Sequence, residues 1–154
     1  MAVLYLEDFA VGQQFRSGSL RVAAQDITRF ATEFDPQPFH LDAAAASESM
    51  LRGLAASGWH TAALTMKLLV GSEFSPAGGI LGVGFDELRW PKPVRPEDDL
   101  HAESEVLSVR PSVSNPRQGL VKVRTVTLNQ KGEAVQVSVG TVIVPRRPDQ
   151  VQKG

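Results

Sequence analysis

The chain of 154 residues contains no cysteine, which excludes disulfides, thiolate nucleophiles and cysteine-ligated metal sites. It also lacks an excess of one charge: the formal net charge of −1 gives no field that would attract nucleic acid or an anionic membrane. The longest apolar stretch, Trp59–Val70, is interrupted by polar residues and is too short to cross a bilayer. The first eight residues show no basic region ahead of an apolar run. We therefore expect a cytoplasmic protein that binds neither nucleic acid nor a membrane.

The composition is that of one ordinary globular domain. Hydrophobic residues make up 42% of the chain and charged residues 21%, within the usual range for a folded domain. We expect this domain to cover residues 1–146. Residues 147–154 are polar and without periodicity, so we expect a flexible C-terminal tail there.

Three helices are expected in the first half. Ile27, Phe30, Ala31 and Phe34 follow the i, i+3, i+4, i+7 spacing, which predicts an amphipathic helix over 25–34. A second helix is expected over 42–50, with Asp42 as its N-cap. Residues 58–71 are apolar nearly all round, which indicates a buried central helix.

The second half has the pattern of strands. Four segments rich in β-branched residues are separated by Pro, Gly and Asn clusters, and the last two should form a hairpin around a turn at 129–132. A buried helix followed by long antiparallel strands indicates an α+β fold in which the sheet curls around the helix. The expected strands are 80–90, 100–109, 120–128 and 134–144.

One segment combines an acid and a base on a stiff backbone. Asp35 and His40 are five residues apart in Phe34-Asp-Pro-Gln-Pro-Phe-His-Leu-Asp42. The prolines prevent the preceding helix from continuing, so the pair should lie just past a helix end. A carboxylate and an imidazole are the usual partners for moving protons near neutral pH. The alternative is that the two residues cap a helix or face solvent in a turn.

Two further segments belong with this one. The sequences Asp35-Pro-Gln-Pro-Phe-His40, Ala55-Ala-Ser-Gly58-Trp-His-Thr-Ala-Ala-Leu64 and Leu88-Arg-Trp-Pro-Lys-Pro-Val-Arg-Pro96 follow one another in this order. Together they resemble the MaoC-like dehydratases, also called (R)-specific enoyl-CoA hydratases. The resemblance covers most of the chain and implies a single hot-dog domain, an antiparallel sheet wrapped around a long helix.

The resemblance also implies an activity. Asp35 and His40 would share a water that adds to a 2-enoyl thioester or leaves a 3-hydroxyacyl thioester. Gly58 opens the central helix, where free backbone N–H groups and the positive end of the helix dipole favour a developing oxyanion. Its missing side chain would let a ligand approach, or would merely permit a tight turn.

We expect four further residues to line or flank the substrate pocket: Gln37, Phe39, Ser57 and Trp59. The family pattern has Asn where Gln37 stands, and commonly His where Ser57 stands. We interpret His60 as a hydrogen-bonded core residue. We expect neither a metal nor a cofactor other than coenzyme A as the carrier of the substrate.

The carrier and partners are less defined. The carrier of the acyl group is either coenzyme A or an acyl-carrier protein. From the family resemblance we also expect a homodimer or higher homo-oligomer. Phosphates of coenzyme A need cations, for which seven residues are candidates: Arg89, Lys92, Arg95, Arg110, Arg117, Lys122 and Arg124.

Two alternatives remain open. A hot-dog thioesterase often carries a carboxylate on its central helix, yet residues 58–71 contain no Asp or Glu. A non-catalytic acyl-thioester binding subunit is left open by the departures at Gln37 and Ser57.

Overall fold

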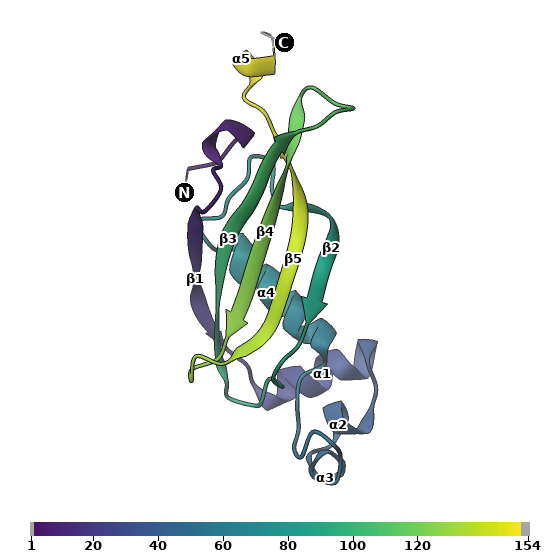
Figure 1. The fold of residues 1–154 in the computed structure, drawn as a ribbon. Coiled ribbons are helices and arrows are strands. Elements are labelled where there is room, and N and C mark those ends of the chain that lie inside the picture. Colours follow the sequence, from purple (N-terminus) through teal and green to yellow (C-terminus); the bar gives the residue numbers. More distant parts are fainter. Residues whose placement is uncertain (1, 152–154) are drawn as a thin grey trace.

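The computed structural model describes residues 2–151. Its main element is one antiparallel sheet that curves around helix α4 (Figure 1). The strand order is β1-β3-β4-β5-β2. The strands are β1 (Gln14–Arg21), β2 (Leu81–Arg89), β3 (Asp99–Pro111), β4 (Gln118–Leu128) and β5 (Ala134–Pro145), and α4 is Gly58–Val70. The α+β class and the sheet curled around a helix are therefore confirmed.

The remaining helices are short. Three of them, α1 (Ala24–Phe34), α2 (Pro38–Leu41) and α3 (Ala43–Ser47), gather beyond one end of the sheet, at the N-terminal end of α4 (Figure 1). A 3-10 turn, η1 (Leu6–Asp8), and a last turn, α5 (Pro148–Val151), lie toward the other end. No helix within residues 2–151 is long and apolar enough to span a membrane.

The β4–β5 hairpin forms where the sequence predicts it. Its turn is closed by the Asn129 side chain, whose oxygen accepts from the backbone N–H groups of Lys131 (2.9 Å) and Glu133 (3.0 Å). Gly132 has φ of 74°, a left-handed conformation that glycine adopts without steric cost. Local sequence is thus sufficient to fix this turn.

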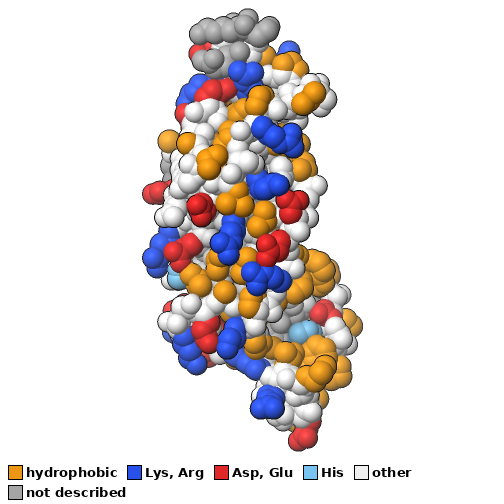
Figure 2. Space-filling view, in the orientation of Figure 1, with side chains coloured by type: hydrophobic (Ala, Val, Ile, Leu, Met, Phe, Trp, Pro, Cys, Tyr) orange, Lys and Arg blue, Asp and Glu red, His pale blue; other side chains and the backbone are white. Residues whose placement is uncertain are grey.

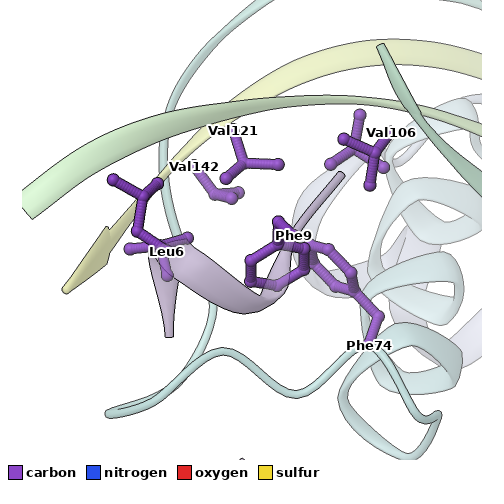
Figure 3. Close-up of a cluster of buried hydrophobic side chains, with 8 residues drawn as sticks. Leu6, Phe9, Phe74, Val106, Val121 and Val142 are labelled. Atoms are coloured by element: carbon purple, nitrogen blue, oxygen red, sulfur yellow. The ribbon is translucent and has the colours of Figure 1, made fainter. Parts of the chain in front are cut away.

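Two apolar clusters hold the layers together. The first joins η1 and the segment that follows α4 to the middle of the sheet through Leu6, Phe9, Phe74, Val106 and Val121 (Figure 3). The rings of Phe9 and Phe74 pack 5.7 Å apart at 60°. Each such side chain contributes about 1.5–3 kcal/mol when fully buried.

The second cluster determines where the N-terminal helices sit. Ile27 from α1 and Leu68 from α4 pack with Val94, Leu100 and Val135. Both Ile27 and Leu100 are fully buried. This packing attaches α1 to the sheet and therefore fixes where the C-terminal end of α1 lies relative to the sheet.

Helix α4 differs from the expectation of full burial. Trp59 and Val70 are each 61% exposed and Met66 is 42% exposed, because the sheet covers only one side of the helix. The side toward the sheet instead carries Thr61 and Thr65. The Thr65 hydroxyl satisfies its hydrogen bonding with the Thr61 carbonyl (2.9 Å) and the hydroxyl of Thr127 on β4 (2.7 Å).

Most of the predicted elements match the structure to within a few residues, and β1, α2 and the short turns η1 and α5 were missed. Strand β1 has Ser17, Gly18 and Ser19 at its centre, where its register with β3 shifts, so its apolar alternation is weak. Helix α2 begins at Pro38, a position where proline is tolerated because its absent N–H would have no partner.

The predicted tail is partly anchored. The Arg147 guanidinium donates to the Asp8 carboxylate (2.6 Å), and its backbone N–H donates to Glu7 (2.8 Å). Residues 152–154 of that predicted tail lie outside the described residues.

His60 is a core residue, as expected, but without the expected hydrogen bond at Nδ1. Its ring stacks on Phe30 of α1 with 4.6 Å between centroids and 7° between planes. Nδ1 is buried and has no partner among the described residues. Burial lowers the pKa of His60; the nearby charges of Asp26 and Arg29 act on it in opposite directions.

Protonation of His60 is therefore disfavoured in the folded state. Below the ordinary histidine pKa of about 6.5 the unfolded chain binds the proton more readily, so stability falls as pH falls. We expect His60→Phe to weaken the loss of stability between pH 7 and 5, measured as the urea midpoint. The control is His101→Phe, since His101 pairs with Glu103 at 3.1 Å on the outer sheet. Equal pH dependence in both variants would contradict the assignment.

Candidate active site

Asp35 and His40 meet at the junction of α1 and α2. Asp35 is the residue after α1, with φ of −152° and ψ of 65°, and His40 lies in the single turn of α2. This turn folds the chain back so that Asp35 Oδ2 lies 3.3 Å from His40 Nε2. The side chains are 18% and 8% exposed, respectively. The acid and the base predicted from the sequence are thus in direct contact.

The His40 ring is held from its other side. Nδ1 lies 2.7 Å from the Ala55 carbonyl oxygen. Because a carbonyl only accepts, Nδ1 carries the proton of this hydrogen bond, and Nε2 faces Asp35. Phe39 packs edge-on against the imidazole at 4.6 Å. The ring can therefore exchange a proton only through Nε2.

Asp35 accepts hydrogen bonds that favour its charged form. The Gln37 side-chain amide donates to Oδ1, and the Ser57 hydroxyl hydrogen-bonds the same carboxylate. Burial by itself would raise the pKa of Asp35, but these two hydrogen bonds and the charge of His40 together lower it. Asp35 is thus an ionised carboxylate at neutral pH, ready to accept a proton.

The N-terminus of α4 points at the same place. Ser57 is the N-cap of α4, and its Oγ accepts from the Trp59 N–H at 3.3 Å. The Gly58 N–H has no protein acceptor among the backbone hydrogen bonds of the described residues. Ser57 therefore connects the dipole of α4 to the carboxylate of Asp35.

Gly58 is needed for packing. A Cβ built on Gly58 would lie 2.7–2.9 Å from ring atoms of Trp90, so even an alanine would overlap the indole. The space that the sequence interpretation reserved for an approaching ligand is thus occupied by Trp90. The role of the Gly58 N–H as an oxyanion donor remains a prediction.

A cavity of about 330 Å³, called the dyad cavity below, opens beside His40; Asp35 is behind the imidazole and is not part of the cavity lining. His40, Gly58 and Thr61 line one side of it, and Trp90 and Lys92 are on the side formed by the β2–β3 connection. The cavity also borders Leu51, Ala55, Ala56, Pro91, Pro93 and Val94. A reactant placed here touches the imidazole and the start of α4 together.

The residues predicted to flank the pocket take different positions. Gln37 and Ser57 bind Asp35, and Phe39 packs on His40. Trp59 is outside the cavity lining and packs edge-on against Trp90, with 5.4 Å between ring centroids. The sequence reasoning did not identify Trp90, although a tryptophan directly before a Pro-Lys-Pro turn at a strand end was a visible signal.

Most of the basic candidates lie elsewhere. Figure 2 shows acidic and basic side chains interspersed over the outer face of the sheet; Lys122 pairs with Asp86 there at 2.7 Å. Arg95 is structural: its guanidinium donates to the carbonyl oxygens of Leu51, Gly53 and Leu54. Of the seven candidates, Lys92 borders the dyad cavity.

Known proteins resemble this chain in sequence and in fold. Residues 8–129 match the model of the MaoC like domain. The chain belongs to this family. The MaoC-like dehydratase from Rhodospirillum rubrum is 56% identical, with a TM-score of 0.91 over 94% of this chain and 99% of that one.

Two other relatives cover most of the MaoC-like domain. An uncharacterized protein of Bacillus subtilis, YdeM, is 37% identical over 141 residues, which is 92% of this chain and 99% of that protein. An (R)-hydratase from A. caviae involved in PHA biosynthesis is 27% identical, with a TM-score of 0.72 over 90% of this chain and 99% of that one. The hot-dog architecture and general hydratase or dehydratase family follow from these matches.

The hydrogen bond from Ser57 should be measurable at Asp35 itself. We expect Ser57→Ala to raise the pKa of the Asp35 carboxyl, because a donor to the charged form is lost. Carbon-13 NMR of the Asp35 carboxyl across a pH titration measures this directly. Ser47→Ala serves as the control, since the Ser47 hydroxyl donates to the Ala44 carbonyl within α3. An unchanged Asp35 titration in Ser57→Ala would show that the contact has no energetic weight.

Proposed function

We propose that the protein hydrates a 2-enoyl thioester, or dehydrates the corresponding 3-hydroxyacyl thioester, in the cavity beside Asp35 and His40. The observation that supports this most strongly is the pair itself: a carboxylate 3.3 Å from an imidazole whose other nitrogen is fixed on a carbonyl. A water bound at both groups would be oriented by one and deprotonated by the other. The family membership agrees with this chemistry.

The steps can be assigned to named atoms. Protonated Nε2 of His40 donates to the water oxygen, and Asp35 accepts a water proton as that oxygen bonds to C3 of the substrate. The C2=C3 electrons move toward the thioester, whose oxygen gains negative charge. His40 then gives its Nε2 proton to C2, and the proton on Asp35 passes to His40. The pair returns to its starting state and no electrons are exchanged, so the reaction requires no redox cofactor.

The developing negative charge has a nearby donor. The N–H of Gly58, which has no backbone acceptor within residues 2–151, lies at the first position of α4, where the helix dipole is positive. Loss of one such donor typically costs on the order of 3 kcal/mol of transition-state stabilisation. The wall formed by Trp90 fixes which side of the thioester can face this N–H.

We assign the carrier from the charge at the cavity rim. Lys92 lies on the lining and forms a weak pair with Glu133 at 3.5 Å, so its ammonium is available to a phosphate. Coenzyme A and the phosphopantetheine arm of an acyl-carrier protein both offer such a phosphate, and we propose coenzyme A as the carrier.

The dyad assignment leads to a direct test. Asp35→Asn and His40→Ala should each lower kcat/KM for trans-2-butenoyl-CoA by roughly 10²–10⁴-fold, since each removes a proton-transfer group. The assay is the loss of enoyl-thioester absorbance. Asp42→Asn is the matched control, because Asp42 caps α3 and should leave turnover near wild type.

The alternatives predict other results. Release of free thiol by the wild type would indicate a thioesterase. Binding of the thioester without any turnover would indicate a binding subunit. Unfolding of both dyad variants, seen by circular dichroism, would mark the pair as structural.

We also propose that the active form is a homodimer that pairs through β2. This strand is an edge of the sheet, and Leu81, Val83 and Phe85 on it are 56–60% exposed. An edge strand offers unpaired backbone groups to a partner, and a second copy can pair with it antiparallel about a two-fold axis. The exposed Met66 and Val70 of α4 would extend the same apolar surface.

Light scattering can test this dimer. We expect a dimer for the wild type and a shift toward monomer for Val83→Lys, because a charge is placed on the apolar edge. Val113→Lys adds the same charge in the β3–β4 connection, where Val113 is 98% exposed, and should remain dimeric. A monomeric wild-type protein would contradict the proposal.

A further inference from the structure

A second cavity lies under the same helix. It measures about 240 Å³, is open to the surface beside the exposed Met66 and Phe85, and is bordered by α4, β2, β4 and β5. Its lining is mainly apolar and includes Met66, Leu69, Phe85 and Val142, with Ser138 at one side. It shares no lining residue with the dyad cavity.

The two cavities follow one another along α4. The dyad cavity takes Gly58 and Thr61 from this helix, and the apolar cavity takes Met66 and Leu69. From residue 61 to residue 66 the helix rises about 7.5 Å. The apolar cavity therefore begins about one and a half helical turns beyond the dyad cavity along the axis of α4.

Trp90 lines the dyad cavity and is bonded to Gln136, which is two positions along β5 from Ser138 of the apolar cavity. In the β2–β5 register Arg89 pairs with Val137, so the next residue, Trp90, stands opposite Gln136. The Trp90 indole N–H donates to Gln136 Oε1 at 2.9 Å. Two positions further along β5, on the same face of the strand, Ser138 already lines the apolar cavity.

The indole is restrained on three sides. One face lies against Gly58, the Trp59 ring packs on it edge-on, and its N–H is bonded to Gln136. Gln136 is only 3% exposed, so a lost hydrogen bond there would not be replaced fully by water. This arrangement holds a large flat side chain as a wall of the dyad cavity.

We propose that Trp90 is a specificity-determining residue that closes the dyad cavity toward the apolar cavity and limits the substrate to short acyl groups. Gln136 is a positioning residue that holds the indole in place. This inference rests on the proposed hydration of an enoyl thioester and adds the size of its acyl group. Without the indole, the two cavities become one continuous, apolar-ended channel.

The decisive measurement is the ratio of kcat/KM for an eight-carbon substrate to kcat/KM for a four-carbon substrate. For wild type and Trp90→Ala, kcat/KM is measured with trans-2-butenoyl-CoA and trans-2-octenoyl-CoA. We expect the wild type to prefer the four-carbon substrate, and Trp90→Ala to shift the ratio toward the eight-carbon one by roughly tenfold or more, as expected when alkyl groups gain an apolar pocket. Val113→Ala changes an exposed side chain that lines neither cavity, and it should leave the ratio unchanged.

Two further variants keep the inference testable if Trp90→Ala does not fold. Trp90→Leu fills part of the space and should shift the ratio in the same direction by less. Gln136→Leu keeps the indole but removes its acceptor, so it should relax the ratio while changing kcat for the four-carbon substrate little. A wild type that prefers the eight-carbon substrate, or an unchanged ratio in folded Trp90 variants, would overturn the inference.

A separate binding experiment distinguishes failure of the proposed hydration from failure of the Trp90 assignment. If no thioester is turned over, Trp59→Phe leaves Trp90 as the single tryptophan of the two in the chain. Its fluorescence is then titrated with butanoyl-CoA and octanoyl-CoA, with Trp90→Phe as the control. A fluorescence change with butanoyl-CoA but not with octanoyl-CoA, absent in the control, would support Trp90 as the wall of a binding site for short acyl groups even though the protein does not hydrate the thioester. No change with either would overturn the inference as well.

Discussion

The hydrogen bond from His40 to the Ala55 carbonyl is the contact on which the site depends. It fixes which imidazole nitrogen faces Asp35, and it joins α2 to the segment that leads into α4. That segment is itself held by the Arg95 guanidinium, which donates to three of its carbonyl oxygens. A cation from the β2–β3 connection thus fixes, through one loop, the orientation of the base.

The polar inner side of α4 has a related cause. Thr61 and Thr65 each satisfy their hydroxyls on a carbonyl one turn earlier, and Thr65 also bonds Thr127. Buried hydroxyls stabilise a fold less than methyl groups of the same size unless they are paired. Here they are paired, and Thr61 also lines the dyad cavity. The helix therefore combines an exposed apolar outer surface with a hydrogen-bonded polar inner surface.

The sequence predicted what depends on local pattern. Asp35 and His40, the two prolines between them and the turn at Asn129 depend on interactions within a few residues of the chain. The structure places the pair just past the end of α1 and forms the turn, as predicted. Burial of α4 was predicted wrongly, because periodicity shows where side chains point but not how many sides of a helix are covered. Strand β1 and Trp90 were missed since their roles depend on pairing with β3 and contact with Gln136, far away in sequence.

The residues proposed for the chemistry and those proposed for substrate specificity lie in different parts of the MaoC-like domain. The groups proposed for proton transfer and the start of α4 all lie between Asp35 and Gly58, so one short segment holds all the residues of the proposed chemistry. The wall comes from Trp90 and Gln136, whose approach is set by the β2–β5 register. A substitution in β5 can therefore change which acyl group fits without touching the dyad. The same register positions the β2 edge, so pairing of two subunits there would also constrain the wall and couple assembly to substrate size.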